Sequence, residues 1–372
     1  VAAFAAAPAE STPGAATARW DGDEVVLDNG LLRVRVAADG TVSSLFDLTH
    51  GREVLAPGSR GALLQLHPDH PNQYEAWDIE SFYRNVTVDL TDVESLGVDG
   101  SDVVVRRGFG SSSASTRLSL APDQARLDVT VDVDWHERER LLKLAFPLDL
   151  HATHYTSEIQ YGHVSRPAHA NTSWDAAMFE TAAQRWVHVG EAGYGVAVVN
   201  RGTYGHDISR PTGGDGRGAE PTTVRLSLVR GPLYPDPRAD EGQHSFSVSV
   251  LAGADLLDAT KAGYAKALPE RTVPGAGWDP VVTSGNPAVV VSCVKLADDR
   301  SGDVIVRLYE ALGGRATTTV GYGFAAGETT VVNLLERQDG ETEHLASVTA
   351  VEGGVQVALK PFQIVTLRVA AG

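Results

Sequence analysis

RLDVTVDVDW, residues 126–135, is the stretch that decides the fold class of this chain. Apolar side chains occupy every second position of it: Leu127, Val129, Val131, Val133 and Trp135. Because successive side chains of a strand point to opposite faces, this alternation predicts a strand with one face in a core. The same period recurs at residues 32–36, 246–250, 304–308 and 355–359. The chain is therefore predicted to be all-β, mostly antiparallel, with packed sheets in sandwich form.

Chain length and the positions of Pro- and Gly-rich segments predict the domain organisation. The 372 residues exceed the usual size of one domain. Residues 1–20 are rich in Ala, Pro, Ser and Thr and are predicted to be a linker. One helix is expected from residue 254 to Pro269, after which a Pro/Gly-rich stretch indicates a boundary. We expect a large β-sandwich domain over 21–275 and a smaller one over 285–372.

Net charge and cysteine content limit the classes of binding partner and the covalent cross-links that the chain can have. The net charge is −17 and the basic residues never form a run, which argues against nucleic acid and an anionic membrane and favours a neutral polar ligand. The lone Cys293 excludes an internal disulfide. No stretch approaches the ~20 apolar residues of a membrane span. We expect a cytoplasmic protein, and the five lysines against 26 arginines indicate a bacterial source.

Histidine spacing gives little support for a metal site. His67 and His70 lie three apart, as do His151 and His154, and this spacing puts two side chains on opposite faces of a strand. A structural zinc site usually has four ligands. The HExxH motif, the phosphate loop, the dinucleotide-binding glycine pattern and GxSxG are all absent.

Residues 74–84, YEAWDIESFYR, combine aromatic rings with carboxylates. Aromatic rings stack on sugars and carboxylates accept hydroxyl hydrogens, so the stretch suits a sugar site. Asp78 and Glu80 alternate with Trp77 and Ile79, which a half-exposed strand would show as well. From composition alone both interpretations stay open.

Ordered blocks along the chain resemble the C-terminal region of glycoside hydrolase family 38, the α-mannosidases. The matching blocks are LDNGLLRVRVAADGTVSSLFDLTHGREVL (27–55), YEAWDIE (74–80), the run from EIQYGHVSRP to TYGHD (158–207), LSLVRGPLYPDPRADEGQHSFSVSV (226–250), VKLADDRSGDVIVRLYE (294–310), NLLE (333–336) and LKPFQIVTLRV (359–369). The resemblance covers roughly residues 22–370 and implies a galactose-mutarotase-like β-supersandwich followed by a smaller β-sandwich.

The resemblance also implies where the chemistry lies. Family members hydrolyse terminal α-linked mannose with retention and hold zinc, nucleophile and acid/base carboxylate mainly in an N-terminal α/β domain. No stretch of this chain matches the motifs for those groups, so no catalytic or metal-binding residue is assigned. The chain alone is expected to be inactive, with zinc in the catalytic domain that it lacks. Its expected partners are that domain and mannose-containing carbohydrate.

Four residues are candidates for the pocket rim or the interdomain contact: Trp77, Asp78, Glu80 and Arg166. Trp77 could instead anchor the core or an interface, and Arg166, extended before Pro167, could hold a loop within the domain. Glu75, Ala170 and Gln184 depart from the family pattern, which weakens the case for direct substrate contact nearby. Residues 194–207, including His206 and Asp207, are expected to be structural.

Two other functions are compatible with the sequence. An independent carbohydrate-binding module would show an exposed row of aromatic side chains. A mutarotase-like enzyme would pair His136 with Glu137 or Glu139 as acid and base. Neighbours on a strand face apart, however, whereas an acid–base pair must converge on one atom. A broad exposed apolar patch would favour the α-mannosidase region.

Overall fold

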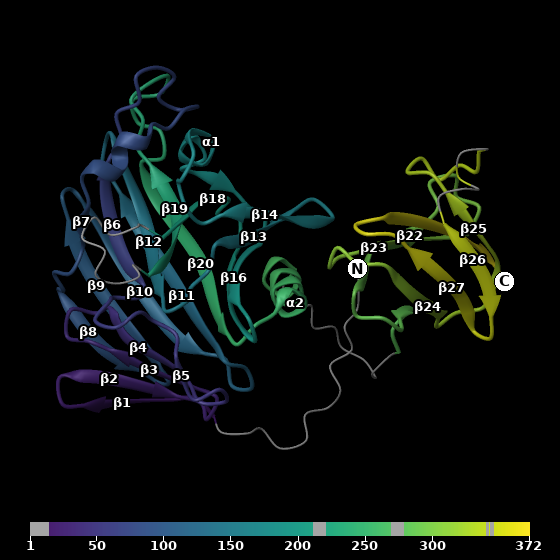
Figure 1. Ribbon diagram of the computed structural model, residues 1–372, viewed down its shortest axis with the longest axis horizontal. Coiled ribbons are helices and arrows are strands. Elements are labelled where there is room, and N and C mark those ends of the chain that lie inside the picture. The colour runs from purple at the N-terminus through teal and green to yellow at the C-terminus, as the bar shows by residue number, and fades with distance from the viewer. Residues whose placement is uncertain (1–14, 211–220, 269–278, 340–341, 343–345) are drawn as a thin grey trace. The chain divides into compact units, whose positions relative to one another are not determined.

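The structure is a computed structural model that describes residues 15–210, 221–268, 279–339, 342 and 346–372. The chain falls into two compact units, Ser11–Glu158 with Ser165–Pro269, and Ile159–Val164 with Glu270–Gly372. Both are built from antiparallel strands with few helices, which confirms the predicted fold class (Figure 1). Residues 1–14 of the predicted linker lie outside the described residues, and β1 (Thr17–Asp21) includes its last four positions.

The large unit holds three sheets. A five-stranded sheet has the order β1-β2-β3-β4-β5, with β2 (Glu24–Asp28), β3 (Leu32–Val36), β4 (Val42–Asp47) and β5 (Arg52–Glu53). A six-stranded sheet has the order β15-β18-β19-β12-β6-β7, with β15 (Thr181–Ala182), β18 (Gly205–Ser209), β19 (Thr222–Arg230), β12 (Arg140–Leu148), β6 (Leu63–Pro68) and β7 (Val88–Asp89).

The third sheet has nine strands in the order β14-β13-β16-β17-β20-β11-β10-β9-β8. Its strands are β14 (Gly162–Pro167), β13 (His154–Ile159), β16 (Trp186–Glu191), β17 (Tyr194–Asn200), β20 (Gly242–Ala252), β11 (Arg126–Trp135), β10 (Ser112–Leu120), β9 (Asp102–Phe109) and β8 (Ser95–Asp99). The stretch that decided the fold class is β11, which pairs with β10 on one side and with β20 on the other.

One core joins the three sheets. The apolar positions of β11 are fully buried, and they pack with the inward residues of β12, among them Leu142, Leu144 and Phe146. The alternation of apolar and polar residues in β11 is thus explained: the apolar face of the strand packs on this core and the polar face points away from it. On β12 the residue between two core leucines, Lys143, points to the outer face of the six-stranded sheet.

Three short helical elements lie in the described part of the large unit. η1 (Ser81–Asn85) and α1 (Ser173–Ala177) lie near the ends of the six-stranded sheet, and α2 (Leu256–Ala267) packs on β16 and β17. A capping box between Asp255 and Asp258 starts α2, and its buried face consists of Ala259, Thr260 and Gly263. The predicted helix is therefore present.

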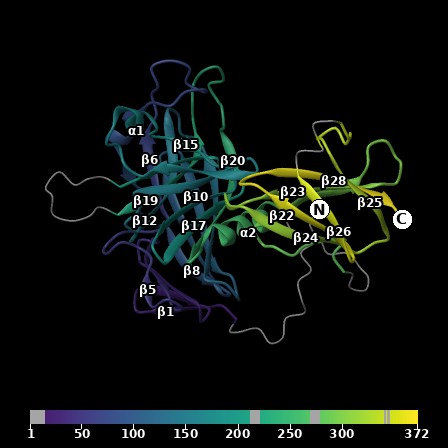
Figure 2. The ribbon, with the colours of Figure 1, turned by 45° about the vertical axis from the view of Figure 1, so that its right-hand side comes forward.

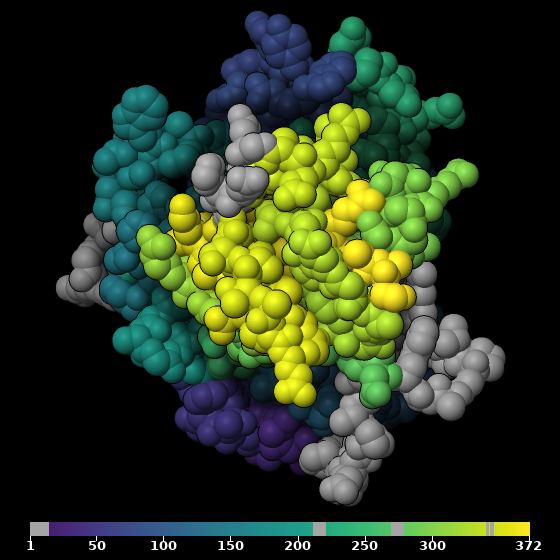
Figure 3. All heavy atoms as spheres, turned by 90° about the vertical axis from the view of Figure 1, so that its right-hand side faces the viewer, coloured from purple at the N-terminus to yellow at the C-terminus, as the bar shows by residue number. Residues whose placement is uncertain are grey.

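The C-terminal unit is a sandwich of two four-stranded sheets. Figure 3 shows the surface of this unit as spheres in light green and yellow. One sheet has the order β21-β24-β27-β26, with β21 (Val282–Ser284), β24 (Ala316–Tyr322), β27 (Gly354–Leu359) and β26 (Ser347–Val351). The other has the order β22-β23-β28-β25, with β22 (Val289–Leu296), β23 (Val304–Glu310), β28 (Ile364–Ala371) and β25 (Ala326–Val332). Its separate core includes Val306, Leu308, Val320, Val357 and Leu367.

Candidate functional site

The predicted aromatic and carboxylate residues lie on the loop between β6 and η1, not on a strand. Trp77 and Asp78 donate their backbone N–H groups to the carbonyl of Tyr74, at 2.7 and 2.8 Å, which closes a tight turn. Trp77 is 68% exposed, so the interpretation of Trp77 as a core anchor is wrong. Residues 77–80 form this turn and the segment that leads into η1. The alternative prediction of a half-exposed strand is therefore also wrong.

An arginine clamp fixes this loop to the rest of the unit. The Arg230 guanidinium, at the end of β19, donates from Nε and Nη2 to the Asp69 carboxylate at 2.6 and 3.1 Å. Nη2 also donates to the backbone carbonyls of Glu75 and Asp78, at 3.1 and 2.6 Å. The Glu75 carboxylate in turn accepts from the backbone N–H groups of Leu233 and Tyr234, at 2.8 and 3.0 Å. The loops after β6 and β19 are therefore tied to each other.

Arg166 lies apart from this loop, on β14 of the nine-stranded sheet. Its Nε is buried and has no hydrogen-bond partner within the described part of the chain. Trp77, Asp78 and Glu80 share the loop between β6 and η1. The structure therefore brings three of the four candidates together and places Arg166 on another sheet.

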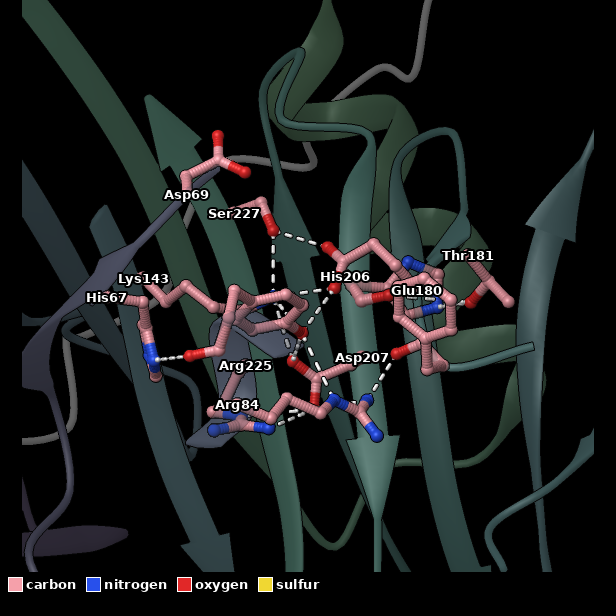
Figure 4. A network of polar contacts seen from close by, with 12 residues as sticks. His67, Asp69, Arg84, Lys143, Glu180, Thr181, His206, Asp207, Arg225 and Ser227 are labelled. Carbon is pink, nitrogen blue, oxygen red and sulfur yellow. Dashed lines mark hydrogen bonds and ion pairs between the residues drawn. The ribbon is translucent and has the colours of Figure 1, made fainter. Parts of the chain in front are cut away.

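Below the loop lies a buried charged network on the outer face of the six-stranded sheet (Figure 4). Lys143 Nζ, excluded from solvent, lies 2.7 Å from Glu180 Oε2, 2.8 Å from Asp207 Oδ2 and 2.8 Å from Ser227 Oγ. The Arg225 guanidinium donates to Asp207 Oδ1 at 3.0 and 2.8 Å. Neighbouring strands β12, β18 and β19 thus each contribute charged side chains.

η1 covers this network. Tyr83 of η1 donates its hydroxyl hydrogen to acceptors at Glu180 Oε2 and Asp207 Oδ2, 2.8 and 3.2 Å away. Arg84 donates to the carbonyl of Phe179, and its guanidinium lies 3.4 Å from Asp207 Oδ1. The Tyr83 and Phe179 rings lie 6.5 Å apart. The network therefore anchors both η1 and the segment that follows α1.

Burial and charge set the protonation of the network. Burial alone would lower the pKa of Lys143, but Asp207 and Glu180 outweigh it, so the pKa is raised and the ammonium stays charged. Burial would raise the pKa of Asp207, but Lys143 and Arg225 hold it well below its usual value. Burial raises the pKa of Tyr83 to about 12. Lys143 and Asp207 therefore both stay charged in the folded unit, and each compensates the burial of the other.

Two buried histidines flank the network. Burial, with the charges of Arg225 and Lys143, lowers the pKa of His67 to about 4. Burial lowers the pKa of His206 to about 4 as well. His206 Nε2 lies 3.1 Å from Thr181 Oγ1 and 3.2 Å from Ser157 Oγ, which agrees with the structural role expected for it. Sequence reasoning missed Lys143 and Glu180, because each stands in a run with no motif around it.

Exposed apolar side chains are carried by the loops after β6 and β19, by η1 and the residue after it, and by α1 and the residue after it. We call this set the apolar end: Tyr74, Trp77, Phe82, Val86, Trp174, Met178 and Tyr234. Trp174 is 83% exposed, and α1, which carries it, has no buried residue. The loops after β6 and β19 and α1 lie at the same end of the large unit in two views (Figures 1 and 2). Such a collection of exposed apolar side chains is typical of an interaction surface.

His67 and His70 each make a separate contact. His67 Nδ1 lies 3.1 Å from the carbonyl of Val86, whereas His70 Nδ1 lies 3.0 Å from the Glu139 carboxylate. No group of three or more His, Cys, Asp or Glu side chains that could hold a metal ion occurs among the described residues. No helix within the described ranges is long and apolar enough to cross a membrane.

The acid–base pair required by a mutarotase-like enzyme is not formed either. His136 Nε2 lies 2.9 Å from Asp134 Oδ1. Glu137 accepts instead from the backbone N–H of Ser111 and the hydroxyl of Ser112, at 2.7 and 3.0 Å. Each group is thus engaged in its own local contact.

Two protein-family models match this chain. Residues 27–238 match the glycosyl hydrolases family 38 C-terminal domain, and residues 288–367 match the glycosyl hydrolases family 38 C-terminal beta sandwich domain. The chain belongs to glycoside hydrolase family 38. It carries the family's C-terminal domains, as the resemblance had predicted.

Similar proteins of known name support this family assignment. The chain is 33% identical over 366 residues to alpha-mannosidase 2C1 of Homo sapiens, covering 92% of this chain and 33% of the relative. It is 28% identical over 396 residues to an alpha-mannosidase of Saccharomyces cerevisiae, covering 93% of this chain and 35% of that protein. The chain thus spans about one third of the length of these curated relatives.

A solved structure supports the fold of this family 38 region. A crystal structure of an alpha-mannosidase from Enterococcus faecalis V583 matches 95% of this chain and 43% of its own, with a TM-score of 0.70 and 15% identity. The likeness shows that the arrangement of sheets is shared at low sequence identity.

Proposed function

We propose that this chain is the non-catalytic C-terminal β region of a retaining, zinc-dependent α-mannosidase that hydrolyses terminal α-linked mannose. The match to both C-terminal domains of family 38 supports the parent activity. The chemistry of the buried network supports a non-catalytic role, because the Asp207 carboxylate at its centre is compensated by Lys143 and Arg225. Glycoside cleavage needs one carboxylic acid and one carboxylate placed about the scissile bond. The chain alone is accordingly inactive.

The apolar end carries this proposal. Seven large apolar side chains are exposed there, including Trp174 on a helix with no buried residue. Water-exposed patches of this kind are costly in a free protein and mark a surface that another domain covers. We assign the covering partner as the catalytic region of the same enzyme. The C-terminal region then supports and borders the sugar pocket, with Trp77, Asp78 and Glu80 at its rim.

The buried network gives the apolar end a firm base. Lys143, Glu180 and Asp207 hold η1 and the segment after α1 against the six-stranded sheet. Because these ties are made below the surface, Phe82, Trp174 and Met178 can stay exposed without loosening the unit. A preorganised surface binds with a smaller entropy cost.

Hydrolysis of a chromogenic α-mannoside tests the proposal. We expect no turnover by this chain with or without zinc, and turnover when a separately produced catalytic region of a family 38 enzyme is added with zinc. Turnover by the chain alone that disappears in Asp78→Asn or Glu80→Gln would show that the chain is itself the enzyme and would refute the proposal.

The docking surface is tested by binding of the two regions. Trp174→Ala with Met178→Ala is expected to weaken the association by at least about tenfold, because exposed aromatic anchors dominate such contacts. Trp20→Ala is the matched control, since Trp20 is also half-exposed (49%) but lies on β1 of another sheet. Equal loss in both variants would exclude the apolar end as the specific contact.

A further inference from the structure

Three aromatic side chains on the two tied loops form a surface of their own, which we call the aromatic platform: Tyr74, Trp77 and Tyr234. Their exposed fractions are 65%, 68% and 65%. The rings of Trp77 and Tyr234 meet edge to face, with centroids 6.5 Å apart. The two loops project together from the large unit in both ribbon views (Figures 1 and 2). The platform is thus presented to solvent by segments that are far apart in the sequence.

The aromatic platform is fixed before any ligand arrives. Arg230 holds the backbone on either side of Trp77 through the carbonyls of Glu75 and Asp78, while Asp69 braces the guanidinium. The Glu75 carboxylate holds the backbone of Tyr234. Both ring-bearing loops are therefore positioned by charged hydrogen bonds, which are the stronger class. A side chain that is rigid on the protein surface loses little entropy when it binds.

Tyr74, whose carbonyl closes the tight turn, combines a left-handed backbone with an exposed ring. Its φ is +57°, in the left-handed region, which bulky residues other than glycine seldom adopt. A tyrosine held there with its ring 65% exposed gains little from the hydrophobic core. Strained backbone of this kind clusters at ligand-binding sites. The position suits a residue whose ring has a partner outside the unit.

Hydrogen-bond acceptors border the aromatic platform. Asp78 Oδ1 accepts from the backbone N–H of Ile79 at 2.9 Å, and Glu80 Oε1 accepts from Asn72 Nδ2 at 3.1 Å. Within the described residues these contacts engage one oxygen of each carboxylate, and both side chains border solvent. A sugar offers an apolar C–H face to an aromatic ring and hydroxyl hydrogens to carboxylates.

We propose that the aromatic platform is a sugar-binding subsite at which a pyranose ring stacks on Trp77, with Tyr74 and Tyr234 at its sides and Asp78 accepting its hydroxyl hydrogens. The site functions in this chain without the catalytic region. The choice of mannose as the sugar rests on the proposed function, whereas the stacking itself rests on the exposed rings and the clamp. Arg230 acts as a positioning residue, because it holds the loop and does not touch the sugar.

Ligand-observed NMR titration of this chain with α-linked mannobiose and with methyl α-mannoside tests the subsite. We expect saturable binding that Trp77→Ala weakens by about tenfold or more, as truncation of a central aromatic contact does. Trp20→Ala is the matched control and should leave the affinity unchanged. Arg230→Lys, which keeps the charge but loses the fork that spans Asp69 and two carbonyls, should weaken binding several-fold with Trp77 intact.

The outcomes separate this subsite from the proposed function. Absence of saturable binding, or equal loss in Trp77→Ala and Trp20→Ala, overturns the subsite. If Trp77→Ala instead weakens association with the catalytic region and the chain binds no sugar, the aromatic platform belongs to the docking surface, and the proposed function stands without the subsite. Sugar binding through Trp77 in a chain that does not associate with a family 38 catalytic region supports the subsite and counts against the docking role.

Discussion

Lys143 Nζ lies 2.8 Å from Asp207 Oδ2, and both side chains are at most 1% exposed. This ion pair joins β12 to β18 across the outer face of the six-stranded sheet. Desolvation of two charges is costly, and the cost is offset here by Glu180 and Arg225, which complete the network. The contact therefore sets the position of the strands that carry the apolar end, even though its net contribution to stability is small.

Removal of the ammonium should be strongly destabilising. Lys143→Met leaves Asp207 and Glu180 close together with one positive neighbour fewer, and breaking a buried pair in this way costs about 3–5 kcal/mol. Urea denaturation followed by tryptophan fluorescence measures it, because Trp135 and Trp186 are buried in the large unit. Lys261→Met on the exposed side of α2 is the control and should cost less than about 0.5 kcal/mol. A similar midpoint for both variants would contradict the buried-network account.

The stability of the large unit should fall as the pH is lowered from about 6.5 to about 4. His67 and His206 have a folded-state pKa of about 4 against an ordinary value of 6.5, so the unfolded chain binds protons in this window and the folded one does not. The stability is complete above pH 6.5 and is lost progressively toward pH 4. The full difference corresponds to about 3 kcal/mol for each histidine.

Denaturation midpoints measured from pH 7.5 to 4 give the slope. His67→Leu should be less stable than the parent at pH 7 but should lose about half of the pH dependence, because one of the two titrating groups is gone. Trp20→Ala, at a half-exposed site on β1 of another sheet and without a titratable side chain, should keep the full slope. A parent protein whose stability is flat between pH 6.5 and 4 would exclude neutral, buried histidines at these positions.

The sequence predicts the strands well and the functional end poorly, for a physical reason. Alternation along β11 depends on the burial of one face, which is visible in neighbouring residues. The clamp at the aromatic platform joins Arg230 to Asp69, which are 161 positions apart. Lys143 stands in the apolar run LLKLAFPL, and its charge is tolerated only because Asp207 on β18 and Glu180, just before β15, reach it. The exposure of Trp77 depends on the same long-range contacts.

Arg185 should determine how firmly α2 is held. Its Nε donates to Glu158 Oε2 at 2.9 Å, and its guanidinium carbon lies 3.7 Å from the centre of the Tyr264 ring on α2. Arg185→Lys keeps the charge but loses both the planar stacking and the paired hydrogen bonds. We expect a loss of about 1–2 kcal/mol and faster amide hydrogen exchange along α2. Arg201→Lys at an exposed site should leave exchange in α2 unchanged, and equal protection in both variants would exclude this anchor.

Gly253 should be more sensitive to a methyl group than another glycine with the same kind of backbone. Its φ is +66°, and a Cβ there would lie 2.6 Å from His50 Cε1 and 3.2 Å from Asp47 Oδ2. Gly193, with φ +82°, has nothing within 4 Å of such a Cβ, so Gly193→Ala reports backbone strain alone, about 1 kcal/mol. Gly253→Ala adds the displacement of His50 from Asp47, whose 2.7 Å contact is lost. Its cost should therefore be about 2–3 kcal/mol.

A double variant isolates the crowding at this glycine. In a His50→Ala background the ring that would meet the new methyl group is gone, so Gly253→Ala should cost no more than Gly193→Ala does in the parent chain. Equilibrium denaturation of the four variants gives the coupling between His50 and Gly253 directly. Because the residues touch, the coupling should be about 1–2 kcal/mol, with His50→Ala relieving the defect. If the two glycine substitutions cost the same in the parent chain, the close seat of His50 over Gly253 does not contribute to stability, and the contact of His50 with Asp47 is held by the turn after β4 alone.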